Sequence, residues 1–318
     1  MHPNVPLVLR LLASSHSISQ KAGSIIRDIM HSGQLNIVDK GFNDLQTEAD
    51  RSSQRCIIRS LMNQFPKVSI IGEENLEKKD YDVPSDWIVD RLEESVLSHR
   101  CPDELQNVQD EDVVVWVDPL DGTSEFTQGL LDHVTILIGL SVKGKAIGGV
   151  IHQPFFNHNK AEEQSNLGRT IWGLMGLGAF GVQKVSPPVG KLIVTTTRSH
   201  SNDLINKSVE ALSPDSVLRV GGAGNKVLQV IEGKAHVYAF ASRGCKKWDT
   251  CAPEGILHAL GGQLTDILGN SLTYIKNENF TNELGVLASH SAANHLEYQS
   301  KIPAEVKERL FAKSQSCF

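Results

Sequence analysis

Two early segments of the chain carry hydrophobic residues at every third or fourth position, the spacing of a helix that covers a core. The first runs over residues 7–30 and stops at Gly33, a residue that commonly ends helices. The second runs over residues 48–64 and is closed by Pro66. We predict a helix at both places. The residues expected on the inner face of the second helix are Ile57, Ile58, Leu61 and Met62.

Short apolar runs bounded by polar residues or glycine predict buried strands. VSIIG (68–72) and VVVWV (113–117) are two such runs, and three more follow as HVTILIGLSV, AIGGVIHQP and TIWGLM. The polar stretch 75–112 between the first two runs indicates a surface excursion that is partly helical. The first half of the chain is therefore predicted to be an α+β domain.

The second half begins after VSPPVGK (185–191), whose two prolines and glycine mark the best boundary. Beyond it, strands such as LIVTTT and HVYAFA alternate with predicted helices at 203–212, 225–231 and 250–260. Such alternation is typical of an α/β domain. We predict an α+β domain over 1–186 and an α/β domain over 187–318.

Charge and apolar runs exclude some classes of function. The 318 residues include 31 Lys and Arg against 37 Asp and Glu, a formal net charge of −6, without a long basic run. No nucleic-acid partner is therefore expected. No apolar run is long enough to cross a membrane, the N-terminal one is too short for a secretory signal, and SQSCF is not a prenylation box. We expect no membrane partner and a cytoplasmic location.

The cysteines are scattered and lack the paired spacing of a zinc site or a disulfide framework. We expect reduced thiols, which fits a cytoplasmic protein. The five are Cys56, Cys101, Cys245, Cys251 and Cys317.

Two glycine-rich motifs resemble nucleotide-binding patterns, but the residues within or beside them do not complete either pattern. GLGAFG (176–181) matches the dinucleotide-binding pattern, but the VQKVSPPVGK that follows cannot begin the helix that such a site needs for a pyrophosphate. GGAGNK (221–226) resembles a phosphate loop, yet Asn225 and Val227 stand where that motif needs Gly and Ser or Thr. We assign the first to a strand turn and exclude a Walker function for the second.

Acidic residues collect where predicted elements end. Glu73 follows one buried strand, Asp118 and Asp121 follow another, and Asp249 lies at the start of a helix. Carboxylates gathered at one place repel one another unless cations lie among them. Oxygen ligands without paired His or Cys favour magnesium. The neighbouring Glu74 is interpreted as a solvated residue.

WVDPLDGT (116–123) and KWDTCAPE (247–254) together resemble the paired signature of the magnesium-dependent, lithium-sensitive phosphatases, the inositol monophosphatase and fructose bisphosphatase superfamily. DLQTEAD, IIGEE, GRTIWGLMGLGAFG, TTTRSHS and VGGAGNK extend the resemblance, over nearly the whole chain, to the 3′(2′),5′-bisphosphate nucleotidases of animals. The resemblance implies a layered α-β-α-β-α sandwich of the inositol monophosphatase type, built from two fused halves.

The resemblance also implies roles for individual residues. Two or three magnesium ions would be held by Glu73, Asp118, the backbone carbonyl of Leu120, Asp121 and Asp249. The proton of an attacking water would be accepted and relayed by Asp50 and Thr123. The nucleotide would be held by Thr197, His200, Gly222 and Lys226. Without the resemblance, His200 is better interpreted as a capping or solvent-facing residue, and Lys246 and Lys247 as an exposed basic pair.

The implied activity is that of a phosphoric monoester hydrolase. It would remove the 3′-phosphate of adenosine 3′,5′-bisphosphate to give AMP, with 3′-phosphoadenylyl sulfate and inositol 1,4-bisphosphate as further candidate substrates and lithium as an inhibitor. The alternatives are an inositol-phosphate phosphatase and a catalytically silent nucleotide sensor. Asp50, Glu73 and Thr123 argue against the sensor, because binding alone does not need residues that activate water. We expect a monomer whose partner is a small bisphosphate nucleotide.

Overall fold

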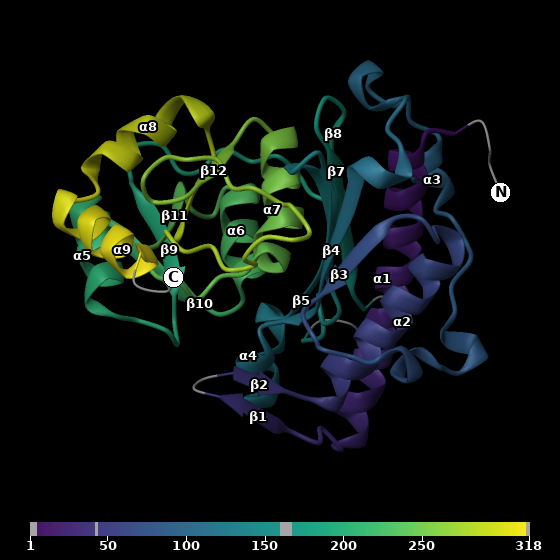
Figure 1. Ribbon diagram of the computed structural model, residues 1–318. Coiled ribbons are helices and arrows are strands. Elements are labelled where there is room, and N and C mark those ends of the chain that lie inside the picture. Colours follow the sequence, from purple (N-terminus) through teal and green to yellow (C-terminus); the bar gives the residue numbers. More distant parts are fainter. Residues whose placement is uncertain (1–4, 42–43, 160–166, 316–318) are drawn as a thin grey trace.

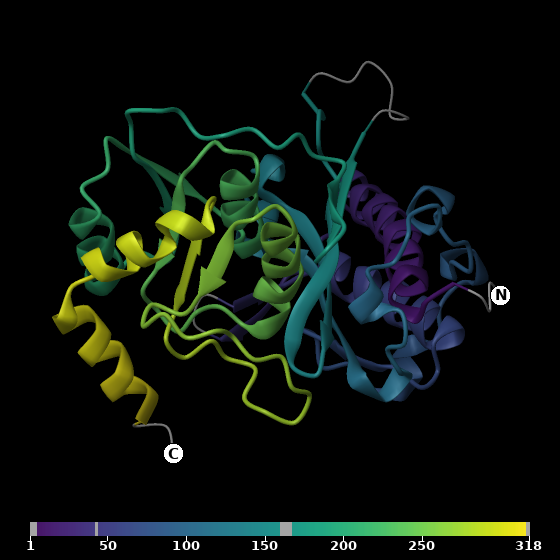
Figure 2. The same ribbon diagram turned by 90° about the horizontal axis from the view of Figure 1, so that it is seen from above.

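The computed structural model describes residues 5–41, 44–159 and 167–315. Its helices and its two large sheets form five alternating layers (Figure 1). A pair of helices, a sheet, a second pair of helices, a second sheet and an outer group of helices follow one another. Seen from above, the layers keep the same order (Figure 2). The predicted α-β-α-β-α sandwich is therefore confirmed.

The first layer consists of α1 (Leu7–Ser32) and α2 (Glu48–Gln64). α1 ends at Gly33, whose φ of 69° belongs to the left-handed region that glycine adopts most easily. Both predicted helices are confirmed. The inner face of α2 buries Ile57, Ile58 and Leu61, but Met62 is 46% exposed. Its place in the inner set was wrong, because one further residue turns a helix by about 100°.

The second layer is a six-stranded sheet in the order β3-β4-β5-β6-β7-β8. β3 and β4 are parallel, and every other neighbouring pair is antiparallel. The excursion between β3 and β4 contains short helical turns, including α3 (Glu94–Leu97), as predicted. The strands are β3 (Ser69–Gly72), β4 (Val113–Asp121), β5 (Thr135–Val142), β6 (Lys145–Gln153), β7 (Arg169–Leu174) and β8 (Gly178–Phe180). GLGAFG forms the turn into β8 and β8 itself, so its assignment to a strand turn is confirmed.

The fourth layer is a five-stranded sheet in the order β10-β9-β11-β13-β12. β9 is parallel to β10 and β11, whereas β13 is antiparallel to β11 and β12. The strands are β9 (Ile193–Thr197), β10 (Ser216–Val220), β11 (Val237–Phe240), β12 (Gln263–Thr265) and β13 (Val286–Ser289). The outer helices are α5 (Asp203–Ala211), α8 (Ala292–Lys301) and α9 (Ala304–Gln315).

Between the sheets lie α6 (Ala223–Ile231) and α7 (Lys247–Ala259). Although α7 lies between β11 and β12 of the second sheet in the chain, it packs on β5 and β6 of the first sheet, and Ala252 and Ile256 share a core with Ile151. A Cβ at Gly255 would lie only 2.5 Å from the Gly148 nitrogen, so glycine allows this close approach. α7 thereby joins the halves and brings Asp249 to the edge of the first sheet.

The segment 181–192 connects β8 to β9 and contains the predicted domain boundary. The division at 186 and 187 itself stays a prediction. Cys56, Cys101, Cys245 and Cys251 are buried free thiols, as expected, and Cys317 lies outside the described residues. Within the described ranges, no helix combines the length and apolar character needed to cross a membrane.

Candidate active site

A β-bulge in β4 explains how two carboxylates three residues apart come to lie together. Asp118 pairs with Leu137 and Asp121 with Thr135, so β4 has one residue more than β5 over this stretch. Side chains alternate along a regular strand, which would place residues three apart on opposite faces. The extra residue corrects this alternation. Asp118 and Asp121 are both buried. They lie so close together that the charge of Asp121 contributes, along with burial, to raising the pKa of Asp118.

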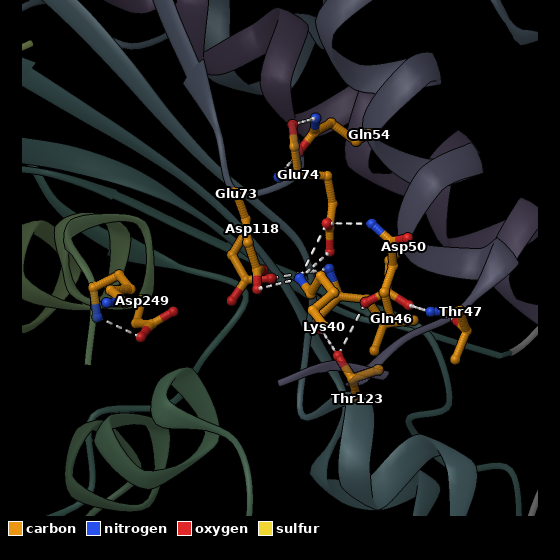
Figure 3. A network of polar contacts seen from close by, with 12 residues as sticks. Lys40, Gln46, Thr47, Asp50, Gln54, Glu73, Glu74, Asp118, Thr123 and Asp249 are labelled. Carbon is orange, nitrogen blue, oxygen red and sulfur yellow. Dashed lines mark hydrogen bonds and ion pairs between the residues drawn. The ribbon is translucent and has the colours of Figure 1, made fainter. Parts of the chain in front are cut away.

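Glu73, directly after β3, and Asp249, in the first turn of α7, face the Asp118 carboxylate of β4 (Figure 3). Burial and the neighbouring Asp249 carboxylate hold the pKa of Glu73 well above its usual value. Burial and Glu73 do the same to the pKa of Asp118. Burial and Asp121 raise the pKa of Asp249 to about 7. The structure therefore brings together the four acidic side chains that the sequence analysis expected to meet at one place.

Glu74 is not the solvated residue that we expected. Its side chain is 2% exposed, and Lys40 Nζ donates to both carboxylate oxygens at 3.0 and 3.1 Å. Gln46 also donates to Glu74, while the Glu74 backbone is held by the side chain of Gln54. Lys40 and Gln46 lie on the hairpin of β1 (Val38–Gly41) and β2 (Asp44–Gln46), which the sequence pattern did not predict. The burial follows from this hairpin, because it covers Glu74 with hydrogen-bonding partners.

Asp50 lies in the first turn of α2, where it forms a capping box with Thr47. The Thr47 nitrogen and hydroxyl donate to Asp50 Oδ2 at 2.7 and 2.5 Å. Thr123 Oγ1, at the start of α4 (Thr123–Thr127), lies 2.9 Å from Asp50 Oδ1 and 3.1 Å from the Leu120 carbonyl. Burial raises the pKa of Asp50 to about 6, against the effect of the Thr47 hydrogen bonds. A carboxylate with this pKa is suited to accept a proton near neutral pH.

Asp121 also ties the first half to α6. Its Oδ1 accepts from the Ala223 nitrogen at 2.6 Å, and its Oδ2 accepts from the Gly224 nitrogen at 2.9 Å. Gly222, with a φ of 72°, precedes them, and a Cβ there would lie 2.8 Å from Asp121 Oδ2. Gly222 is therefore required for this approach. Lys226, one turn into α6, donates from Nζ to the Gly222 carbonyl at 2.8 Å.

Two neighbouring cavities open at these carboxylates. The first, of about 180 Å³, lies between α4, the end of β9 and α6, and a second, of about 700 Å³, shares Glu73, His200 and Asp249 with it. The predicted substrate residues Thr197, His200, Gly222 and Lys226 all line the first cavity. Its walls also include residues that the sequence analysis did not select: Glu125, Ser199, Tyr238 and Phe240.

His200 is exposed, and its backbone nitrogen donates to Thr197 Oγ1 at 3.1 Å. The solvent-facing interpretation and the resemblance are thus both compatible with its position at the cavity wall. The interpretation of Lys246 and Lys247 as an exposed pair was wrong for Lys247, whose side chain is 5% exposed and lies 3.3 Å from Glu278. Lys247 faces inward because it begins α7, which is enclosed between the sheets.

The donor set fits a hard divalent cation. The acidic side chains and the Leu120 carbonyl offer only oxygen, and burial together with the neighbouring carboxylates raises the pKa of Glu73, Asp118 and Asp249. Among the residues that the structure describes, no three His, Cys, Asp or Glu side chains already surround a single point as a formed site. Asp121 and Asp249 instead accept from backbone nitrogens, and Glu73 lies 3.7 Å from Lys40.

Comparison with solved structures defines the class of fold. Inositol monophosphatase II from Staphylococcus aureus MSSA476 superimposes with a TM-score of 0.68 at 19% identity, covering 97% of this chain and 98% of that one. The extragenic suppressor protein suhB from Bartonella henselae gives 0.65 at 20% identity, covering 91% and 96%. The protein therefore has the inositol monophosphatase fold.

Sequence comparison then gives the family. Residues 9–307 match the model of the inositol monophosphatase family. The chain is 54% identical to 3′(2′),5′-bisphosphate nucleotidase 1 of Homo sapiens, over 96% of this chain and 97% of that protein. It is 40% identical to the protein of the same name in Dictyostelium discoideum, over 92% and 95%. The chain belongs to the inositol monophosphatase family and is a hydrolase.

Proposed function

We propose that the protein is a magnesium-dependent phosphatase that hydrolyses the 3′-phosphate of adenosine 3′,5′-bisphosphate to AMP and phosphate. The sulfated relative 3′-phosphoadenylyl sulfate and inositol 1,4-bisphosphate are further proposed substrates. The observation that carries this proposal is the position of Lys226 and His200 on the wall of a cavity that also contains Glu73, Asp121 and Asp249. The identity of 54% to a protein named for this activity supports it.

In this proposal, magnesium is held by Glu73, Asp118, the Leu120 carbonyl, Asp121 and Asp249. When bound, it would make water easier to deprotonate and would offset the charge of the phosphate. The ions number two or three.

Asp50 and Thr123 receive the proton of the attacking water. Thr123 can donate its hydroxyl proton to Asp50 Oδ1, at 2.9 Å, and its oxygen then accepts the water proton. The water oxygen forms a bond to phosphorus, and the bond from phosphorus to the ribose 3′-oxygen breaks. That oxygen takes a proton from solvent water, and Asp50 returns the proton it received to solvent. Asp50 suits this role because its pKa of about 6 leaves it mostly ionised at neutral pH.

Substrate selectivity is proposed to come from the second half of the chain. The same ions and water serve any phosphate monoester, so selection requires groups that bind the part of the substrate that does not react. Lys226 offers a positive charge to the 5′-phosphate. Thr197, His200 and Gly222 hold the adenosine.

Phosphate release from a substrate panel at fixed magnesium tests the proposal. The panel contains adenosine 3′,5′-bisphosphate, 3′-phosphoadenylyl sulfate, inositol 1,4-bisphosphate and inositol monophosphate, and we expect the highest kcat/KM for the first. A preference for inositol monophosphate would favour an inositol-phosphate phosphatase. Binding of the nucleotide without turnover would identify a sensor. A cytoplasmic location and a monomeric state remain predictions from the sequence.

A further inference from the structure

Glu125 is a buried carboxylate to which none of the roles above is assigned. It lies in α4, two residues after Thr123, and is 3% exposed. Its Oε1 lies 3.4 Å from Arg198 Nη1 and 3.5 Å from Ser199 Oγ. A buried carboxylate is costly without a partner, so the pair with Arg198 holds α4 and the segment after β9 together.

The same carboxylate packs against the segment that begins α6. A Cβ at Gly221 would overlap the Glu125 carboxyl group, so the side chain occupies space that only glycine leaves open. The Gly221 nitrogen donates to His133 Nδ1 at 3.2 Å, which adds a second link from the first half of the chain. Gly221 directly precedes Gly222, whose carbonyl accepts from Lys226.

Arg198 does not line either cavity at the carboxylates, although it lies in TTTRSHS. Its Nη2 donates instead to Gln128 Oε1 at 2.9 Å, beside α4. The next residue, Ser199, has its Oγ 3.0 Å from His200 Nδ1. A chain of contacts thus runs from Glu125 through Ser199 to the His200 ring at the cavity wall.

We propose that Glu125 is a positioning residue that sets both nucleotide-binding segments, 197–200 and 221–226, against the helix that carries Thr123. The inference rests on the proposed function. Glu125 belongs to the first half of the chain, and its carboxylate contacts both segments of the second half. Because those segments bind the unreacting part of the substrate, loss of Glu125 acts on nucleotide affinity more than on the chemical step.

The test compares Glu125→Gln and Arg198→Met with the wild type. Gln keeps the shape of Glu and removes its charge. For adenosine 3′,5′-bisphosphate we expect KM to rise by about tenfold or more, with kcat within about threefold. The KM for 4-nitrophenyl phosphate, which has no adenosine, should rise less. Arg198→Met serves as an independent probe, because the Arg198 side chain is 38% exposed and tolerates substitution better than a buried one.

The double variant tests whether the two residues act as a unit. If they do, it should be no worse than the stronger single variant. Glu305→Gln is the matched control, since Glu305 pairs with Lys207 and Arg309 on the outer surface, and it should leave both substrates unaffected.

Three results would overturn the inference while the wild type still hydrolyses the nucleotide: an unchanged nucleotide KM in both variants, equal losses on both substrates, or additive effects in the double variant. Melting temperatures of all variants identify losses caused by unfolding. A wild type that does not hydrolyse the nucleotide would refute the proposed function, and the inference with it.

Discussion

Replacing Thr47 with Val should move the acid limb of the pH-activity profile to higher pH. The Thr47 hydroxyl donates to Asp50 Oδ2 at 2.5 Å, and this hydrogen bond lowers the pKa of a carboxyl group that burial raises to about 6. Val has nearly the same shape but no hydroxyl. A hydrogen bond to a charged group contributes about 1.5 to 3 kcal/mol. Since one pKa unit corresponds to about 1.36 kcal/mol, the pKa of Asp50 should rise by roughly one to two units.

The direction follows from which form of Asp50 is active. Only the ionised carboxylate accepts a proton, so activity is lost below the pKa of Asp50. With the pKa near 7 to 8, kcat/KM at pH 7 should fall by about two- to tenfold and recover near pH 9. The assay is phosphate release from adenosine 3′,5′-bisphosphate between pH 5 and 9, with wild type and variant at the same magnesium concentration.

Thr47 also caps α2 by accepting from the Ala49 nitrogen at 3.1 Å. Loss of the cap should cost about 0.5 to 2 kcal/mol of stability, measured as the free energy of unfolding. Thr47→Ser retains the hydroxyl and should retain both the profile and the cap. If Thr47→Val lowered stability but left the acid limb unchanged, Thr47 would act only as a cap and the reasoning about Asp50 would be refuted.

Four further predictions address the metal site, the pocket and the core. Asp249→Asn should lower kcat by at least about a hundredfold, or 2.7 kcal/mol of barrier, and near-normal turnover at saturating magnesium would contradict its role as a ligand. Lys226→Ala should lower kcat/KM for adenosine 3′,5′-bisphosphate by about 10- to 100-fold, the effect of losing a charged hydrogen bond, and should affect inositol 1,4-bisphosphate less. Lithium at tens of millimolar should inhibit even at high substrate, and full activity relative to a sodium control would exclude its binding at a magnesium position. Burial raises the pKa of Glu254 from 4.5 to about 8, so the folded state holds a proton that the unfolded state loses, and stability should fall as pH rises through this window. Glu254→Gln should flatten that slope, as measured by melting temperature from pH 5 to 8, and a slope equal to that of the wild type would contradict the assignment.

Local signals in the sequence predicted most of the elements. Apolar spacing found α1 and α2, and the uninterrupted run VVVWV found β4, an inner strand of the first sheet, because burial on one or both faces imposes a short-range pattern. The β1–β2 hairpin, α8 and α9 were not predicted. The hairpin is exposed over β1, so no buried face marks it in the sequence. The capping box of Thr47 and Asp50 could have been found from its Thr-x-x-Asp spacing.

The acidic residues themselves were also evident in the sequence, since Glu73, Asp118, Asp121 and Asp249 each stand next to a predicted strand or helix. That they meet at one place was expected from their common position at element ends and from the resemblance, but how they meet depends on contacts between distant segments. Only the bulge in β4 puts Asp118 and Asp121 together, and only the packing of α7 on β5 and β6 carries Asp249 to them.

Burial of charge was likewise decided by tertiary structure. Glu74, Lys247 and Glu125 are charged residues of types that usually lie on the surface, yet all three are buried in the fold. Each is covered because a partner from elsewhere in the chain arrives beside it: Lys40, Glu278 and Arg198, respectively. The burial of a hydrophobic residue can be predicted from its own chemistry and from its spacing in the sequence. A buried charge depends on a neighbour that only the folded chain supplies, and for that reason its place could not be predicted from the sequence.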